Sequence, residues 1–318
     1  MATRSSRLGA LLSVETLAVM ATCGVLAVAA CGDSNDGGFV AVAEGGVDLP
    51  VDEGGTTSET GPPDPTPGCG ATGVKTGAST QTLMADGAKR SFELFVPDTY
   101  DSKKSFPLVF VFHGDGGDGK NIRGSFKLEA EAAGGAIFVY PDGENQTWDI
   151  DTPSGLGHDI AFIDAIVTTL SDTHCVDKKR IVPVGFSKGA YFVNMLACLA
   201  KSSFAGVVAH SGGGPFGVDG SGTDFDGNGN LICPRPPVAA MQIIGDADGL
   251  LDDARKARDY WTRLNTCKAT TKPFAPSPCV AYDGCNAARP EIYCEIPGMG
   301  HTLWTSAPKA TWTFIKSR

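Results

Sequence analysis

The sequence predicts an α/β fold in which a mostly parallel central sheet carries helices on both faces, with no large lid domain. Three observations support this prediction. Short apolar, β-branched runs alternate with helical patterns from residue 69 to residue 318, as expected for parallel strands joined by helices. The runs have the length of buried strands. Several of them end in glycine-rich turns, and the length of this region suits one domain.

The predicted strands and helices alternate along the chain. We expect strands at residues 90–96, 108–112, 136–140, 181–184, 206–209, 238–244 and 291–296. We expect helices near residues 120–133, 157–171, 188–201, 252–265 and 306–316. In sheets of this kind the functional site lies at the carboxyl ends of the strands. The turns that follow the strands are therefore the place to look for reactive side chains.

The N-terminus has the pattern of an export signal. Arg4 and Arg7 precede an apolar stretch that runs from Thr16 and ends in Val28-Ala29-Ala30-Cys31. Residues 1–31 therefore predict a signal peptide with a lipobox-like end, whose Cys31 is acylated and anchors the protein facing the periplasm or the cell exterior. The stretch is shorter than the ~20 residues of a transmembrane helix. A plain secretory signal, which would give a fully secreted protein, is the alternative.

Residues 32–68 have a composition that cannot form a hydrophobic core. They contain eight acidic residues, no Lys or Arg, and many Gly, Pro and Thr, so we expect a disordered tether before a folded domain at residues 69–318. The whole chain has a formal net charge of −10. Because the tether carries most of that charge, the folded domain is close to neutral. The sequence has no basic patch of the kind that binds nucleic acid.

The cysteines fit an exported protein. Setting aside Cys23 in the signal and Cys31 leaves an even number, which favours disulfide bonds in an oxidising compartment. A zinc site is the rival interpretation, but no pair of cysteines has C-x₂-C spacing. Spacing alone does not give the pairing. The eight remaining cysteines are Cys69, Cys175, Cys198, Cys233, Cys267, Cys279, Cys285 and Cys294.

A candidate nucleophile, Ser187, lies in the stretch Gly185-Phe186-Ser187-Lys188-Gly189. The apolar run before it and the helical pattern after it supply the strand–turn–helix context that a G-x-S-x-G motif requires. The flanking glycines let the backbone turn sharply. The alternative is a polar residue in a glycine-rich turn. A serine hydroxyl becomes a nucleophile only when a base takes its proton and a third group orients that base.

The base and the acid are sought among a few side chains. Of the five histidines, His301 is the best base, because it lies on a glycine-containing turn after the last predicted strand. His113 is better explained by backbone shape, and His210 by a core or supporting role. Asp246 and Asp248 lie between Ser187 and His301, in the chain order typical of α/β-hydrolases. Asp248 lies deeper in its loop and is preferred, although local chemistry does not separate the two strongly.

Other residues are candidates for stabilising the reaction or binding the substrate. The backbone amides of Lys188 and Asp115 are expected to form the oxyanion hole. The Lys188 side chain is expected to face solvent, where its charge would favour an anionic ester. Phe186, Trp148 and Trp304 are candidate walls for an aromatic or sugar-linked group, although large aromatic side chains more often belong to the core.

One further motif matches the opening of a calcium-binding loop. Asp224, Asp226 and Asn228 have the required spacing, but the twelfth position is Arg235 instead of a bidentate Glu. We therefore favour a polar surface turn, and we expect no metal and no cofactor.

These segments, in this order, resemble the polyhydroxybutyrate depolymerase and feruloyl esterase family of secreted α/β-hydrolases (carbohydrate esterase family one-like). The similarity extends from about Gly68 to the C-terminus. The resemblance implies the α/β-hydrolase fold and a triad of Ser187, Asp248 and His301, which favours Asp248 over Asp246. The segments that carry it are RSFELFVP at 90–97, FPLVFVFHG at 106–114, FVYPDG at 138–143, HDIAFIDAI at 158–166, HCVD at 174–177 and GFSKG at 185–189.

The resemblance also implies disulfide pairs, and it has departures. It suggests Cys198 with Cys233, Cys267 with Cys285, and Cys279 with Cys294. The family often has Asn, Tyr or Gln where Lys188 stands, a proline soon after the acid, and an aromatic residue closer to the histidine than Trp304 is. These departures concern the substrate pocket more than the chemistry, so the resemblance does not decide which ester is the substrate.

The sequence thus predicts a monomeric, membrane-tethered serine esterase that cleaves small or polysaccharide-linked esters through an acyl-enzyme. Feruloyl or acetyl esters of plant polysaccharides are the preferred substrates. A polyhydroxyalkanoate depolymerase is the first alternative. The second is a non-catalytic surface binding lipoprotein on the same fold, which would have no need of all three triad residues.

Overall fold

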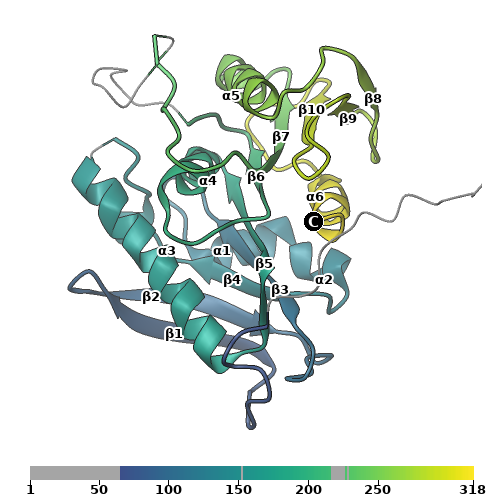
Figure 1. Cartoon of the computed structure of the whole chain (residues 1–318). Helices are drawn as coiled ribbons and strands as arrows, with labels where there is room; N and C mark the ends of the chain where they lie inside the picture. The colour runs from purple at the N-terminus through teal and green to yellow at the C-terminus, as the bar shows by residue number, and fades with distance from the viewer. Residues whose placement is uncertain (1–64, 152, 216–225, 228) are drawn as a thin grey trace, which may run out of the picture. The chain divides into compact units, whose positions relative to one another are not determined.

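The computed structural model describes residues 65–151, 153–215, 226–227 and 229–318 (Figure 1). All of them belong to one compact unit, Thr56–Arg318. The predicted signal peptide with Cys31 and most of the predicted tether lie outside the described residues. Within the described residues, no helix is both long enough and apolar enough to cross a membrane.

A ten-stranded sheet forms the centre of the described chain, in the order β1-β2-β4-β3-β5-β6-β7-β10-β9-β8. The six strands from β4 to β10 in this order pair in parallel, and the strands at both edges pair antiparallel. The strands are β1 (Gly77–Ala85), β2 (Ala88–Val96), β3 (Phe106–Phe112), β4 (Ile137–Pro141), β5 (Val176–Phe186), β6 (Gly206–His210), β7 (Ala239–Gly245), β8 (Thr271–Pro273), β9 (Val280–Tyr282) and β10 (Glu291–Ile296).

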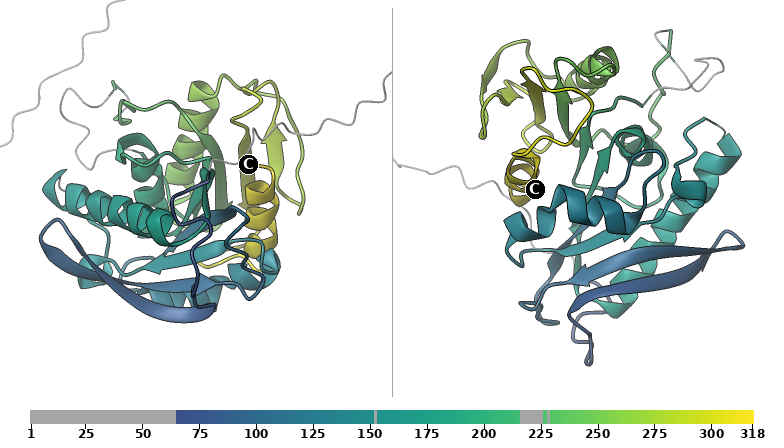
Figure 2. Two further views of the ribbon diagram at one scale, coloured as in Figure 1. Left: turned by 60° about the horizontal axis from the view of Figure 1, so that its bottom comes forward. Right: turned by 180° about the vertical axis from the view of Figure 1, so that it is seen from behind.

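Helices cover both faces of this sheet (Figure 2). Alternate residues of β3 show how the two layers form: Leu108 and Phe110 pack in one apolar cluster with α3, α4 and α5, whereas Val109 packs in a second cluster with α1, α2 and α6. A strand that is apolar on both sides is what a central parallel strand requires. The helices are α1 (Gly119–Phe126), α2 (Leu128–Ala132), α3 (Pro153–Thr173), α4 (Lys188–Leu199), α5 (Leu251–Leu264) and α6 (Ala307–Lys316).

The predicted architecture is confirmed, with differences in three places. The helix predicted at 120–133 is two helices, because Lys127 between them has a left-handed φ of 55°. Strand β1 was missed because its half-buried positions include Gly77, Ser79 and Gln81, so it has no apolar alternation. The three-residue strands β8 and β9 are too short for any sequence pattern to indicate them.

The folded part begins before residue 69, where the sequence had placed the end of the tether. Thr66 is buried, and its hydroxyl donates to the carbonyl oxygen of His174 at 2.8 Å. Pro65 forms a β-bridge with Asp177. The disulfide Cys69–Cys175 holds the same segment beside the start of β5. Residues 65–68 are therefore part of the domain.

All three disulfide pairs implied by the resemblance are present. Cys198 is bonded to Cys233, Cys267 to Cys285, and Cys279 to Cys294. With Cys69–Cys175, the eight cysteines are completely paired. Structural disulfides of this number form in oxidising compartments, so they indicate an exported protein.

Candidate active site

The turn between β5 and α4 holds Ser187 in a conformation that few serines adopt. Its backbone has φ 54° and ψ −123°, outside the usual regions for a residue with a side chain. The flanking glycines make this turn possible. A Cβ on Gly185 would lie 2.1 Å from the carbonyl oxygen of Gly189, and a Cβ on Gly189 would lie 2.6 Å from that of His113. The turn therefore presents the Ser187 hydroxyl at the carboxyl end of the sheet.

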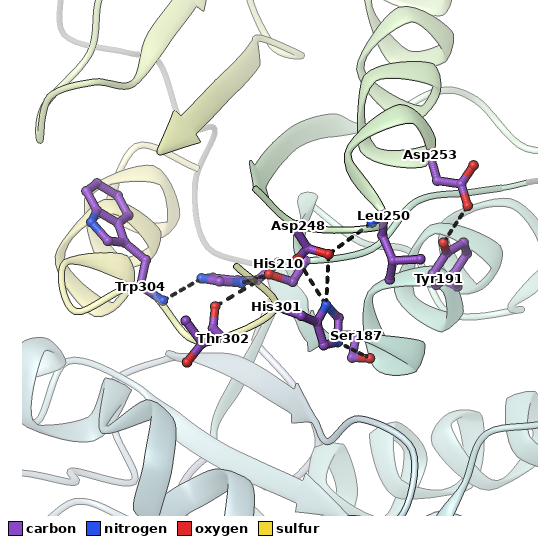
Figure 3. Close-up of polar contacts among 10 residues, drawn as sticks. Ser187, Tyr191, His210, Asp248, Leu250, Asp253, His301, Thr302 and Trp304 are labelled. Atoms are coloured by element: carbon purple, nitrogen blue, oxygen red, sulfur yellow. Dashed lines mark hydrogen bonds and ion pairs between the residues drawn. The ribbon is translucent and has the colours of Figure 1, made fainter. Parts of the chain in front are cut away.

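His301 and Asp248 meet this hydroxyl in one continuous line of contacts (Figure 3). The Nε2 atom of His301 lies 2.9 Å from Ser187 Oγ, and its Nδ1 atom lies 3.0 and 3.1 Å from the two carboxylate oxygens of Asp248. A carboxylate can only accept, so Nδ1 carries the proton and Nε2 is free to accept the proton of the hydroxyl. The Asp248 side chain is 1% exposed, whereas that of His301 is 41% exposed.

The structure separates the two aspartates that the sequence could not. Asp248 contacts His301, and its Oδ1 atom also accepts the amide of Leu250 at 3.0 Å. Asp246 instead accepts the amide of Gly298 at 2.7 Å. That contact joins the turn after β7 to the turn after β10. Asp246 thus helps to position the loop of His301 without touching the imidazole.

The two amides predicted for the oxyanion hole lie in adjoining turns. Lys188 is the first residue of α4, and Asp115 lies in the turn after β3. That turn packs closely on the nucleophile, since a Cβ on Gly114 would lie 2.9 Å from Ser187 Cβ. In the described part of the chain, neither amide donates a hydrogen bond to another residue. The Lys188 ammonium lies 3.5 Å from the Asp151 carboxylate, so it is paired and not simply solvent-facing.

The prediction that Trp148 is a wall of the substrate pocket is wrong. Its side chain is completely buried, and its indole stacks on Phe192 with 4.9 Å between ring centroids. The indole N–H donates to the carbonyl oxygen of His113 at 2.9 Å. Trp148 therefore belongs to the core, and its hydrogen bond to His113 supports the turn that contains Asp115.

Phe186 and Trp304 have different relations to the candidate triad. The Phe186 ring lies 5.3 Å from the imidazole of His301. The half-buried Trp304 ring points away from Ser187 (Figure 3). It lines a separate cavity of about 320 Å³ with Phe126, Leu303 and other residues near the start of α6.

Two buried histidines near the triad were given only general roles by the sequence. His113 directly follows β3 and His210 is the last residue of β6, and burial lowers the pKa of each. The Nε2 atom of His113 accepts the amide of Gly143 at 2.9 Å, which joins the turn after β3 to the turn after β4. Their positions at the ends of parallel strands are the signal that could have marked both as supports of the site.

Two of the three residues of the candidate calcium loop, Asp224 and Asn228, lie outside the described residues. The carboxylate of Asp226 accepts the amide of Asn230 and pairs with Arg263 at 3.2 Å. Elsewhere in residues 65–318, the described part of the chain has no cluster of three or more His, Cys, Asp or Glu side chains placed to hold a metal ion.

No family model matches the chain, but individual relatives do. The chain is 32% identical over 274 residues to feruloyl esterase C of Emericella nidulans, a match that covers 78% of this chain and 90% of the relative. It is 28% identical to feruloyl esterase D of Neurospora crassa, covering 79% and 90%.

Among solved structures, the chain is similar to the acetyl xylan esterase of Aspergillus awamori, with a TM-score of 0.54, 16% identity, and coverage of 74% of this chain and 99% of that one. A ferulic acid esterase of Anaeromyces mucronatus gives a TM-score of 0.50 at 17% identity, covering 77% and 92%. These likenesses show the α/β-hydrolase fold. With the identity and coverage of the Emericella relative, they lead to the conclusion that the chain belongs to the feruloyl esterase family of carboxylic ester hydrolases.

Proposed function

We propose that the protein is a serine esterase that cleaves feruloyl esters, or related acetyl esters, carried by plant polysaccharides. The observation that carries the proposal is the unbroken line of contacts from Ser187 through His301 to Asp248. The curated relatives named feruloyl esterases support the substrate class. All three side chains come from one chain, so the candidate triad is complete without a partner subunit.

Each residue has a distinct role in the proposed reaction. His301 Nε2 takes the proton of Ser187 as Oγ attacks the ester carbonyl, and Asp248 stabilises the imidazolium that forms. The amides of Lys188 and Asp115 donate to the developing oxyanion. His301 then gives its proton to the leaving alcohol oxygen, so that the acyl group stays on Ser187. Water, activated by the same imidazole, releases the acid.

The test of the nucleophile is Ser187→Ala. Turnover should fall by several orders of magnitude, because residual catalysis then comes from the oxyanion hole and binding alone. Thermal unfolding should be close to wild type, since the variant only removes a hydroxyl from a surface turn. Near-wild-type hydrolysis by this variant would reject the assignment.

A substrate panel distinguishes the candidate functions. Methyl ferulate, p-nitrophenyl acetate and a short hydroxybutyrate oligomer should be compared by kcat/KM. The proposal expects the hydroxybutyrate oligomer to be the poorest of the three, because it is neither a feruloyl nor an acetyl ester. A preference for the oligomer would favour the depolymerase, and no hydrolysis of any ester would favour the binding protein.

The proposal extends to how the enzyme is held. The residues Val28-Ala29-Ala30-Cys31 and the acidic stretch after them support a lipid anchor at Cys31 with a tether that carries the domain away from the membrane. One acyl chain binds a membrane only marginally, so the multiple chains of a lipidated N-terminal cysteine are needed. Wild type should sediment with membranes, and Cys31→Ser should release it with unchanged kcat. A soluble wild type that begins at another residue would leave a secreted esterase.

A further inference from the structure

His210, the last residue of β6, makes backbone and side-chain contacts to two of the three triad loops. It is completely buried. Its carbonyl oxygen accepts the amide of Ser187 at 2.9 Å. Its Nε2 atom accepts the amide of Trp304, three residues beyond His301, at 3.0 Å (Figure 3). A single residue thus bonds to the turn of the nucleophile and to the loop of the base.

The protonation of the His210 ring follows from its partners. A backbone amide can only donate, so Nε2 carries no proton and Nδ1 does. Nδ1 donates to Ser211 Oγ at 3.1 Å, and that hydroxyl points to the carbonyl oxygen of Thr302 at 3.5 Å. Burial, opposed by Asp248 and reinforced by His301, lowers the pKa of His210 to about 3. The ring therefore stays neutral, with Nε2 an acceptor, at any pH at which an esterase works.

Ser211 extends these contacts toward the third triad loop. Its amide donates to the carbonyl oxygen of Ile243 in β7 at 2.7 Å, and its left-handed φ of 53° turns the chain at this point. Strand β7 leads directly into the turn that contains Asp248. His210 and Ser211 together therefore contact the turn of Ser187, the strand before Asp248 and the loop after His301.

The His301 loop depends on such contacts because little of it is buried. The imidazole itself is 41% exposed. Before His301, the loop is bonded to the turn after β7 through Gly298 and Met299. After His301, Leu303 and Trp304 pack against the second apolar cluster, and the hydrogen bonds to the described chain outside the loop and α6 are those of Thr302 and Trp304 with Ser211 and His210. His301 is thus held between one anchor on each side.

Aromatic packing fixes the His210 ring in the orientation that these bonds need. The Phe186 ring lies 5.6 Å from His210 and 5.3 Å from His301, so it is shared between the two imidazoles. On another side, the Phe126 ring meets His210 edge-on at 6.3 Å. A side chain at position 210 with the wrong shape or no acceptor would leave the amide of Trp304 unpaired.

We propose that His210 is a positioning residue, which holds the loop after His301 so that the imidazole stays in line with Ser187. The role rests on the triad chemistry proposed above. Geometry is what it contributes, because a displacement of about 1 Å at a reacting group can cost on the order of 100-fold in rate. The residue touches neither the ester nor the reacting atoms.

The experiment compares His210→Leu with His210→Gln. Leucine has a similar volume but no acceptor, whereas the amide oxygen of glutamine can reach the place of Nε2 and accept from Trp304. With p-nitrophenyl acetate, we expect His210→Leu to lower kcat by about 10–100-fold with KM within about threefold of wild type. His210→Gln should recover most of that loss. Rates are expressed per active site, from the burst of p-nitrophenol, so that unfolded protein does not count.

A destabilised control separates positioning from folding. Ile166 is completely buried in α3, on the face of the sheet opposite to α1 and α6, and Ile166→Val should lower stability with unchanged kcat per active site. If His210→Leu behaves like this control, or if glutamine does no better than leucine, the proposal is overturned. These outcomes leave the triad intact, since Ser187→Ala tests it separately.

Two measurements do not depend on the folding of His210→Leu. Ser211→Ala removes the link to Thr302 with little change in volume, and we expect kcat to fall about 3–10-fold. The ¹⁵N chemical shifts of His210 in the wild-type protein should show an unprotonated Nε2 between pH 5 and 9. A protonated Nε2, or unchanged kcat in Ser211→Ala, would contradict the proposed positioning role of His210.

Discussion

Two sides of the candidate site are each held by a buried histidine, but with different numbers of supporting contacts. On the oxyanion side, defined as residues 113–118 and 141–149, His113 joins the two segments. On the base side, defined as residues 297–305, His210 joins the loop to the nucleophile turn. Both imidazoles accept a backbone amide at Nε2. The same kind of hydrogen bond therefore occurs in a region with many supporting contacts and in a region with few.

The oxyanion side is held several times over. Asp142 accepts the Gly119 amide at the start of α1 and the Ser91 hydroxyl in β2. Arg90 donates to the carbonyl oxygen of Asp142 and pairs with the buried Asp159, which in turn accepts the Asp149 amide. Oxyanion donors act best when they are already in place before the reaction. The redundancy of these contacts suits that requirement.

The base side has fewer contacts, and its imidazole must both accept and donate a proton during the reaction. His301 takes a proton from Ser187 and later delivers it to a leaving alcohol, so it faces solvent and substrate and cannot be buried. Because each contact carries more of the positioning, single changes on this side should affect turnover. Single changes on the oxyanion side should affect stability first.

The largest effect is expected from Asp248→Asn, because the carboxylate of Asp248 contacts His301 of the base side. The Asn oxygen will stay with the Leu250 amide, which needs an acceptor, so the Asn NH₂ group faces His301 Nδ1. The imidazole proton then moves to Nε2, which can no longer accept from Ser187. We expect kcat to fall by about 10³–10⁴-fold, measured with methyl ferulate.

Asp246→Asn is the matched control for this change. Its oxygen can still accept the Gly298 amide, so kcat should stay within about threefold of wild type. Equal losses in the two variants, or a greater loss in Asp246→Asn, would move the acid to Asp246.

The next effect concerns the oxyanion side and appears in stability. Arg90 and Asp159 are 7% and 3% exposed, respectively, so Arg90→Leu leaves a buried carboxylate without its partner. Such a loss costs about 3–5 kcal/mol of unfolding free energy. Urea unfolding should show this loss, while kcat per folded molecule at 25 °C falls less than it does for His210→Leu. A larger kcat loss with unchanged stability would reverse the comparison.

The sequence predicted the members of the candidate triad more completely than the contacts that hold either side of the site. Ser187, Asp248 and His301 are polar residues after apolar runs, a pattern that is local and visible. Trp148 was misassigned because the sequence does not show whether a tryptophan lines a pocket or is buried with its indole N–H bonded to a backbone carbonyl. The tie between Asp142 and Gly119 links residues 23 positions apart, and the tie between His210 and Trp304 spans 94. No local sequence pattern contains such pairings. Strand β1 was missed for a similar reason, because its polar residues give no apolar alternation.

A smaller effect is expected at the far end of the strand that leads to His301. Glu291 begins β10, is completely buried, and both its carboxylate oxygens lack a hydrogen-bond partner in the described structure. Burial raises the pKa of Glu291 well above its ordinary value. The folded protein therefore keeps this proton to higher pH than the unfolded chain does, so stability decreases as pH rises above about 4.5. In Glu291→Gln, this decrease between pH 5 and pH 8 should be smaller, as measured by thermal unfolding. A curve parallel to that of wild type would contradict it.

The smallest effect is expected at Trp304, and it concerns the substrate more than the machinery. His301 must protonate the leaving alcohol, so the alcohol part of the ester lies on the base side, where Leu303 and Trp304 line the cavity of about 320 Å³. A polysaccharide bonded to that alcohol oxygen would extend along this loop, and an indole offers a flat apolar surface to a sugar ring. Trp304→Ala keeps the backbone amide that His210 accepts. We therefore expect an increase of about 3–10-fold in KM for a feruloylated oligosaccharide, with kcat and KM for methyl ferulate within about twofold of wild type. Trp304→Phe, which keeps a smaller flat ring, should give an intermediate KM. An equal increase for both esters would mean that the ring supports the loop and does not meet the sugar.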